Sequence, residues 1–268
     1  SALDSNSLVS DVRAVKVSRW WWVAPSVCAL ILIALVAVGA GLDPQSMQFP
    51  RLAAPGARAG DAVSLVGADA SGRDVMARVA HGAMSTIGLA LMCALVSWVI
   101  GLAMGLVPGV ALGPLEAANA VPPVLAGILV ATILGPSDWG ATLAVLLVSW
   151  APLAAHTASL RDEVSATPYA TMAPLLGVSR ARFLVRTVLP TIAGPVFRHA
   201  MLRVPGIALA IASLGFLGLG PQPPRPDWGL MLADGITYIE RAPWVSFAPM
   251  AALVLLSVLA VSASSRKV

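Results

Sequence analysis

Charged side chains are scarce in this sequence. Of its 268 residues only 11% are Asp, Glu, Lys or Arg, and 58% are hydrophobic, whereas a soluble domain averages about 25% charged residues. The deficit extends along the whole chain and raises the mean hydropathy to +0.84. It excludes an ordinary soluble domain and predicts an all-α polytopic membrane protein. Because the net charge is only +4, we expect no nucleic-acid partner.

Catalytic and metal-binding groupings are also missing. The two cysteines, Cys28 and Cys93, lie in apolar runs and provide neither a disulfide framework nor a metal cluster. The patterns GxxxxGK[ST], HExxH and GxSxG do not occur. His81, His156 and His199 are far apart in the sequence, and we expect each to lie near a membrane boundary rather than to hold a metal. The sequence therefore predicts a chain that is not an enzyme and binds no cofactor or metal itself.

Ionisable residues are almost absent from the apolar runs, which disfavours an ion-coupled carrier. Arg203 is the exception, because it lies about three turns into the fifth run. Either it snorkels to the membrane surface, or that run starts later, or Arg203 faces a polar translocation path.

Six apolar runs are long enough to be transmembrane helices. They cover residues 22–42, 84–107, 118–134, 140–160, 192–214 and 247–263. Pro122 and Pro123 fall inside the third run, where we expect a kink. In the second run Gly101, Gly105 and Gly109 share one helix face, which predicts close helix packing within the chain or against a partner.

The distribution of basic residues predicts the orientation of these spans in the membrane. Those before the first span and after the last are Arg13, Lys16, Arg19, Arg266 and Lys267, and segment 161–190 adds Arg161, Arg180, Arg182 and Arg186. The opposite loops balance their arginines with acidic residues, so the positive-inside rule places both termini and segment 161–190 in the cytoplasm.

The predicted parts are a cytoplasmic tail (1–21), a first span (22–42), an external loop (43–83), a five-helix core (84–263) with an external segment (215–246), and a cytoplasmic tail (264–268).

The end of the external loop has a helix signal of its own. The residues SGRDVMARVAHGAMS predict an interfacial helix that is opened by Ser71, has Asp74 near its positive end, and leads into the second span.

The polar segment 161–190 carries the most specific motif. Its second part is YATMAPLLGVSRARFLVRTVLP, which resembles the coupling loop of bacterial ABC importer permeases. The family pattern is Glu-Ala-Ala, three residues, Gly, nine residues, Ile, one residue and Leu-Pro. Gly177, Leu189 and Pro190 fall at the required spacing, and Tyr169 matches a position that is frequently Tyr in the peptide-importing branch.

The same segment departs from the pattern in several places. Met172 and Ala173 occupy the two Ala positions, but Thr171 replaces the Glu and Thr187 replaces the Ile. Pro174 lies inside what should be a short helix over residues 170–176. The motif is therefore of moderate specificity by itself.

Three further regions resemble the C-type subunit of the dipeptide, oligopeptide and nickel branch of this family. Residues 67–83 read GADASGRDVMARVAHGA, residues 116–136 read EAANAVPPVLAGILVATILGP, and residues 214–244 read LGFLGLGPQPPRPDWGLMLADGITYIERAPW. The third match, to LSFLGLGxQPPxPxWGxML followed by APW, is long and highly specific. Together the matches run in order over most of the chain.

The resemblance implies the type I ABC importer permease fold with a cytoplasmic coupling helix. It also implies a bacterial inner-membrane complex with a B-type permease subunit, ATPase subunits that hold ATP and Mg, and an external substrate-binding protein. The implied solutes are di- and oligopeptides, with nickel or another small ligand as the alternative. A scaffold that recruits an ATPase without transporting anything stays open.

Two sets of site residues follow. The resemblance implies ATPase coupling through Tyr169, Thr171, Met172, Ala173, Gly177, Val178, Ser179, Arg180, Leu189 and Pro190. Gly177 would permit a tight turn, and Ser179 would cap the next helix. The external segment, stiffened by PQPPRP, is either a structural cap or a gate and docking surface for the binding protein. Its candidate contacts are Asp227, Trp228, Asp234, Glu240 and Trp244.

Overall fold

The computed structural model describes residues 23–107, 113, 116–117 and 120–264. The predicted N-terminal tail and the basic residues near both termini lie outside the described residues. Helices dominate the described part, and one antiparallel pair of two-residue strands, β1 (Arg58–Ala59) and β2 (Ala62–Val63), is a small exception to the all-helical prediction.

The helices follow one another in a simple order. They are α2 (Val23–Ala40), α3 (Val75–Leu106), α5 (Pro123–Leu134), α6 (Asp138–Ser165), α7 (Pro168–Met172), the 3₁₀ helix η2 (Ala173–Leu176), α8 (Arg180–Phe183), the π-helical turn η3 (Leu184–Val188), α9 (Leu189–Leu202), α10 (Val204–Phe216), α11 (Trp228–Ile236) and α12 (Trp244–Ser264).

Three of the six predicted spans are confirmed as helices long and apolar enough to cross a membrane. These are α3, α6 and the continuous run Arg180–Phe216, which contains α8, η3, α9 and α10. The other three predicted spans coincide with the shorter apolar stretches of α2, α5 and α12.

The predicted third span, 118–134, is wrong at its start. Instead of a kinked helix, the structure has α5 beginning at Pro123, with Pro122 as its N-cap. Proline suits the first turn of a helix because its missing N–H is not needed there. The 12 residues of α5 extend about 18 Å, which is less than the roughly 30 Å of a hydrocarbon core.

The start of α3 also differs from the prediction. The N-cap is Asp74, whose Oδ1 accepts a hydrogen bond from the Ala77 N–H at 2.8 Å. Ser71 instead lies in the preceding turn, where its N–H donates to Asp69 Oδ1 at 2.8 Å. Asp74 caps better because its carboxylate also compensates the positive helix end. The predicted interfacial helix and second span are one continuous helix of 32 residues.

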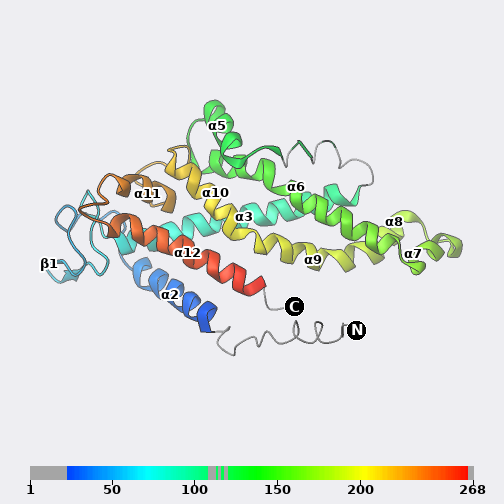
Figure 1. Cartoon of the computed structure of the whole chain (residues 1–268), viewed down its shortest axis with the longest axis horizontal. Helices are drawn as coiled ribbons and strands as arrows, with labels where there is room; N and C mark the ends of the chain where they lie inside the picture. The colour runs from blue at the N-terminus through cyan, green and yellow to red at the C-terminus, as the bar shows by residue number, and fades with distance from the viewer. Residues whose placement is uncertain (1–22, 108–112, 114–115, 118–119, 265–268) are drawn as a thin grey trace, which may run out of the picture.

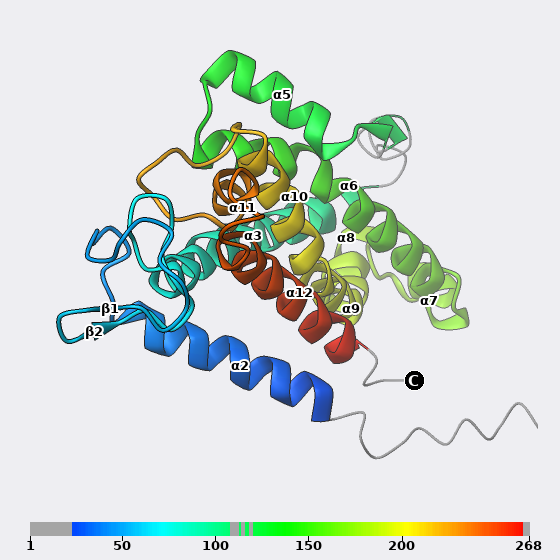
Figure 2. The ribbon, with the colours of Figure 1, turned by 60° about the vertical axis from the view of Figure 1, so that its left-hand side comes forward.

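Helices α3 and α10 form the centre of the molecule. One buried cluster joins them to α5 and α6, and a second joins them to α11 and α12. Helix α2 packs on α3 and α12. Figures 1 and 2 show α7 and α8 at one end of the long helices, whereas β1 and α11 lie at the other end.

The glycine face of α3 packs against α6, as the spacing predicted. A Cβ at Gly101 would lie 2.6 Å from the Leu153 Cβ, and one at Gly105 would lie 2.5 Å from the Ala154 carbonyl oxygen. Real side chains do not approach so closely, so only glycine allows this helix separation. Gly109 lies outside the described residues.

Candidate functional site

The segment between α6 and α9 forms a helical hairpin at one end of the molecule (Figure 1). Arg161, in the last turns of α6, joins its base to α3. Its Nη1 donates to the Gly105 carbonyl at 2.9 Å, and its Nε and Nη2 donate to Asp162 Oδ1 at 2.9 and 2.7 Å. The last carbonyls of a helix lack partners within it, and a cation there also favours the helix dipole. The hairpin is thus held to the ends of two long helices.

The first arm of the hairpin consists of α7 and η2. Thr167 caps α7, because its Oγ1 accepts from the Ala170 N–H at 3.4 Å, and Pro168 occupies the first turn. Pro174 has no N–H to donate to Ala170, so the α-helical ladder cannot continue through it. The arm instead tightens to the 3₁₀ helix η2 after Met172. The proline that departs from the family pattern therefore changes the type of helix without ending the arm.

Gly177 makes the turn of the hairpin. Its φ of 75° and ψ of 12° are left-handed. Its N–H donates to the Pro174 carbonyl at 3.0 Å, and the Val178 N–H donates to the Ala173 carbonyl at 3.1 Å. This bond pair is the Schellman ending that favours glycine. Ser179 then caps α8 through its Oγ, which accepts from the Arg182 N–H at 3.4 Å.

The Gly177 turn yields a direct prediction. No atom lies within 4 Å of a Cβ built there, so a substitution meets only a conformational penalty of about 1–2 kcal/mol for a left-handed residue. We expect Gly177→Val to speed amide hydrogen exchange of residues 177 and 178 about tenfold, as measured by mass spectrometry. Gly177→Asn is the control, since Asn tolerates this conformation. Equal exchange in both variants would contradict the role given to the turn.

The outer side of the hairpin is apolar and exposed. Four large side chains of α7 and η2 are more than half exposed: Tyr169 (63%), Met172 (53%), Leu175 (78%) and Leu176 (75%). We call these four residues the apolar rim. The Tyr169 ring lies 6.1 Å from the Phe183 ring of α8, measured between centroids. Through this contact the rim residue Tyr169 joins the first arm to the second.

The inner side of the hairpin encloses a cleft of about 340 Å³ against the end of α6. Among its lining residues are Arg161, Ala173, Pro174, Arg180, Phe183 and Val188. Ala173 is only 3% exposed. The hairpin thus has one face turned toward its own chain and one face with no partner in the described chain.

The Leu189-Pro190 pair marks the return into the long helix. Pro190 cannot donate to the Arg186 carbonyl, which is the bond an α-helix would need there. The preceding turn is a π-helix, in which the Leu189 N–H donates to the Leu184 carbonyl. One extra residue is thereby accommodated before α9.

The opposite end of the molecule is closed by α11. Asp227 caps this helix through Oδ1, which accepts from the Gly229 and Leu230 N–H groups at 2.8 and 3.1 Å, and its Oδ2 accepts from the Thr86 hydroxyl at 3.1 Å. Burial raises the pKa of the Asp227 carboxyl in spite of these bonds. The Trp228 Nε1–H donates to the Val79 carbonyl at 2.9 Å.

The permease-like arrangement of the hairpin and the long helices has a counterpart in a known protein family. Residues 99–266 match the family described as binding-protein-dependent transport system inner membrane component. The match covers more than half of the chain, and it includes the hairpin, α6, α9, α10 and α11. The chain belongs to this family. It is a permease component of an ABC importer, as the resemblance predicted.

Curated relatives of the permease are similar over most of its length. The di/tripeptide transport system permease protein DppC of Pseudomonas aeruginosa is 36% identical over 212 residues, which are 76% of this chain and 69% of the relative. The peptide transport system permease protein SapC of Escherichia coli is 33% identical over 230 residues, or 83% and 77%. The dipeptide permease DppC of Haemophilus influenzae is 28% identical over 242 residues, or 85% and 81%.

A solved structure shares the fold of the permease. A chain of the MetNI methionine ABC transporter in inward-facing conformations superposes with a TM-score of 0.57. The alignment covers 72% of this chain and 95% of that chain at 18% sequence identity. At this identity the likeness concerns the arrangement of helices alone.

The predicted coupling residues of the permease fall into three groups. Those that are exposed are Tyr169, Thr171, Met172, Gly177, Ser179, Arg180 and Pro190. Val178 and Leu189 are partly buried, and Ala173 is buried in the cleft. Ala173 therefore supports the hairpin from inside and offers no surface to a partner in this conformation. Leu175 and Leu176 belong to the short helix predicted over residues 170–176 but were not among the predicted coupling residues, although their positions within two helical turns of Tyr169 are a signal for one exposed patch.

Two of the residues that the docking hypothesis requires at the external surface are buried instead. Asp227 and Trp228 are both 0% exposed, so neither can touch a binding protein on this surface. Their burial favours the structural cap, the other alternative for the segment. Asp234 and Glu240 are exposed, and Trp244 is half-buried with its Nε1–H donating to the Ala68 carbonyl at 3.3 Å.

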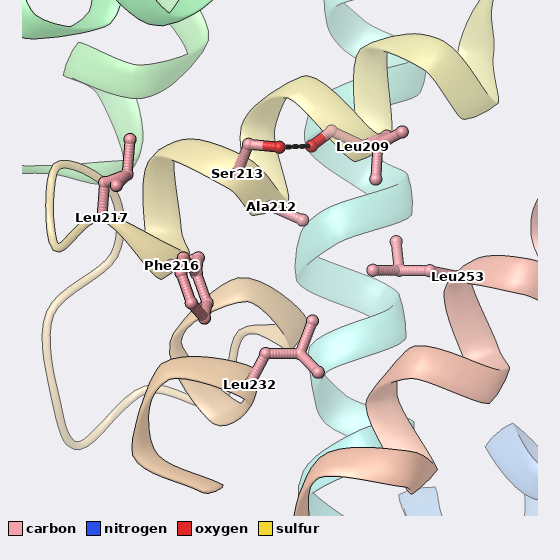
Figure 3. A pocket seen from close by; sticks show the side chains of 7 residues that line it. All are labelled: Leu209, Ala212, Ser213, Phe216, Leu217, Leu232 and Leu253. Carbon is pink, nitrogen blue, oxygen red and sulfur yellow. Dashed lines mark hydrogen bonds between the residues drawn. The ribbon is translucent and has the colours of Figure 1, made fainter. Parts of the chain in front are cut away.

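An apolar pocket of about 280 Å³ lies beside this cap, between α10, α11 and α12 (Figure 3). Six of its seven lining residues are Leu, Ala or Phe, and the seventh is Ser213. The Ser213 hydroxyl donates to the Leu209 carbonyl of its own helix at 2.7 Å. The one polar lining group is thus satisfied within its own helix, and the rest of the pocket wall is apolar.

Two histidines that sequence reasoning kept apart are in contact. His156 of α6 and His199 of α9 stack with their ring centroids 4.7 Å apart. Their separation of 43 positions in the sequence gave no signal for this contact. In the described part of the permease, no group of three or more His, Cys, Asp or Glu side chains could hold a metal ion.

Proposed function

We propose that this chain is the permease subunit of an ATP-driven importer of di- and oligopeptides, and that its helical hairpin receives the stroke of the ATPases. One observation carries the proposal: the apolar rim is exposed at the end of the long helices, on a hairpin with the family spacing of Gly177 and Leu189-Pro190. The peptide solute rests on the similarity to permeases of peptide, di/tripeptide and dipeptide transport systems.

The rim suits a groove on a soluble partner. Burying a leucine side chain contributes about 1.5–3 kcal/mol, so Leu175 and Leu176 together provide a substantial part of a docking energy. Arg180, Arg182 and Arg186 follow on the other arm, and each is exposed. Exposed arginines beside an apolar anchor favour an acidic partner surface and guide its approach.

The hairpin is built to transmit movement. Its first arm continues from α6, its second arm continues into α9, and Arg161 ties α6 to the end of α3. A partner that grips the rim would therefore act on three long helices together. ATP-dependent closure of the ATPases would favour one of two arrangements of these helices and thus drive alternating access.

The proposal has a definite membrane arrangement. The six predicted spans form a type I importer permease in the bacterial inner membrane, with both termini and the hairpin in the cytoplasm and α11 outside. A B-type permease completes the translocation path, two ATPase subunits hold ATP and Mg, and a binding protein delivers the peptide. This chain performs no catalysis itself.

Reconstitution tests this function. We expect vesicles with the complete complex to take up a radiolabelled dipeptide on addition of ATP and binding protein, and to lose at least nine tenths of this uptake when the present chain is omitted. Nickel in place of the dipeptide is the solute control. Undiminished uptake without the chain would favour a scaffold, and ATP-driven uptake of nickel without peptide uptake would assign the other solute class.

A further inference from the structure

A cluster of basic side chains lies where α6 meets the joint between α9 and α10. His199 stacks on His156 of α6. Arg203 follows His199 by four positions, which places both on one face of the continuous helical run. His199 lies within electrostatic reach of both His156 and Arg203. Three basic side chains from two membrane-spanning elements therefore meet at one place.

The cluster has no counter-ion in the described chain. The ion pairs among the described residues join Arg73 and Arg78 to Asp69, Arg161 to Asp162, and Arg225 to Asp138. The guanidinium of Arg203 takes part in none of them, and its Nε is buried without a hydrogen-bond partner. The acidic residues of α6 nearest to His156, Asp162 and Glu163, lie more than one turn further along and are exposed. An unpaired guanidinium charge inside a membrane-spanning element raises the free energy of the folded protein, so an anion that pairs with Arg203 would complete the site.

The helices leave room beside the cluster. Gly206 follows Arg203 by three positions and His199 by seven, so it lies on the same face. No atom of another element lies within 4 Å of a Cβ built at Gly206. Pro152 in α6 and Pro205 in α10 each lie within four positions of the cluster and withhold a backbone N–H. The cluster therefore lies close to a proline in each of the two helices, and its Gly206 side is unfilled.

We propose that His156, His199 and Arg203 form a carboxylate-binding station in the translocation path, which recognises the C-terminal carboxylate of the transported peptide. The proposal rests on the importer function and specifies its solute as a peptide with a free carboxylate. Arg203 supplies the charged donor, since a guanidinium bonds a carboxylate through two parallel N–H groups. The stacked imidazoles supply further ring N–H donors at its side.

A binding measurement on the complete complex without binding protein tests the station. The probes are a radiolabelled tripeptide with a free C-terminus and the same tripeptide as its C-terminal amide. We expect the free acid to bind wild type about 10-fold to 100-fold more tightly, the range for a charged hydrogen-bonded pair. Arg203→Gln should remove this preference, and Arg203→Lys should keep much of it. Equal binding of acid and amide to wild type would overturn the proposal without any variant.

Arg198→Gln is the matched control, because Arg198 is exposed on the same helix and directly precedes His199. We expect it to leave the preference for the acid unchanged. If Arg203→Gln weakens the association of the two permease subunits and leaves peptide binding unchanged, Arg203 pairs with an acidic residue of the partner permease and the proposal is wrong. If wild type takes up no peptide in the vesicle assay, the importer function fails instead, which is a separate result.

Discussion

Replacing Leu175 and Leu176 together by Glu is expected to abolish peptide uptake while the permease stays folded. Both side chains are at least three-quarters exposed, so the change removes no packing within the chain. Docking would lose about 3 kcal/mol or more of apolar burial and would have to desolvate two carboxylates in addition. We expect at least a hundredfold weaker binding of the ATPases, measured by co-purification, and uptake at background in vesicles.

The controls separate the apolar contact from charge and from folding. Leu175→Met with Leu176→Met keeps an apolar rim and should retain most of the uptake. Ala181→Glu adds a carboxylate on the exposed second arm, outside the rim, and should have only a small effect. Normal uptake by the double Glu variant, with an unchanged melting temperature, would show that the ATPases do not dock on the rim.

The long helices and the hairpin turn were predictable because their signals are local. An apolar run of about 20 residues has no stable alternative to a helix in lipid, and α3, α6 and the run through α10 obey this rule. The left-handed Gly177 and the capping Ser179 follow from the chemistry of neighbouring residues. The signal at Pro123 was equally local, but it allows two interpretations. A proline can begin a helix or kink a transmembrane helix, and the predicted kink was the wrong one.

The contacts between distant segments were not predictable in the same way. Asp227 and Trp228 resemble surface residues in a Pro-rich segment, and their burial depends on a donor and an acceptor 141 and 149 positions earlier, in α3. The meeting of His156 with His199 likewise depends on how α6 crosses α9. Such contacts depend on tertiary packing, for which one sequence holds no period or motif.

Trp228→Ala is expected to destabilise the permease strongly, because Trp228 is the largest fully buried side chain of the described residues. It fills the space between α11 and α3, where a Cβ at Gly82 would lie only 2.9 Å from the Trp228 Cδ1. Removing a buried tryptophan leaves a cavity and costs about 3–5 kcal/mol. The melting temperature of the purified protein should fall by on the order of 10 °C.

Trp139→Ala is the control for Trp228→Ala, since Trp139 at the start of α6 is 70% exposed and should change the melting temperature little. The pair also decides between the two roles considered for the external segment. If the external segment is a structural cap, Trp228→Ala should lower the melting temperature. The binding protein should still stimulate the variant below that temperature, and stimulation should be lost only when the variant unfolds. An unchanged melting temperature with lost stimulation would instead make Trp228 a docking residue, exposed in another conformation of the permease.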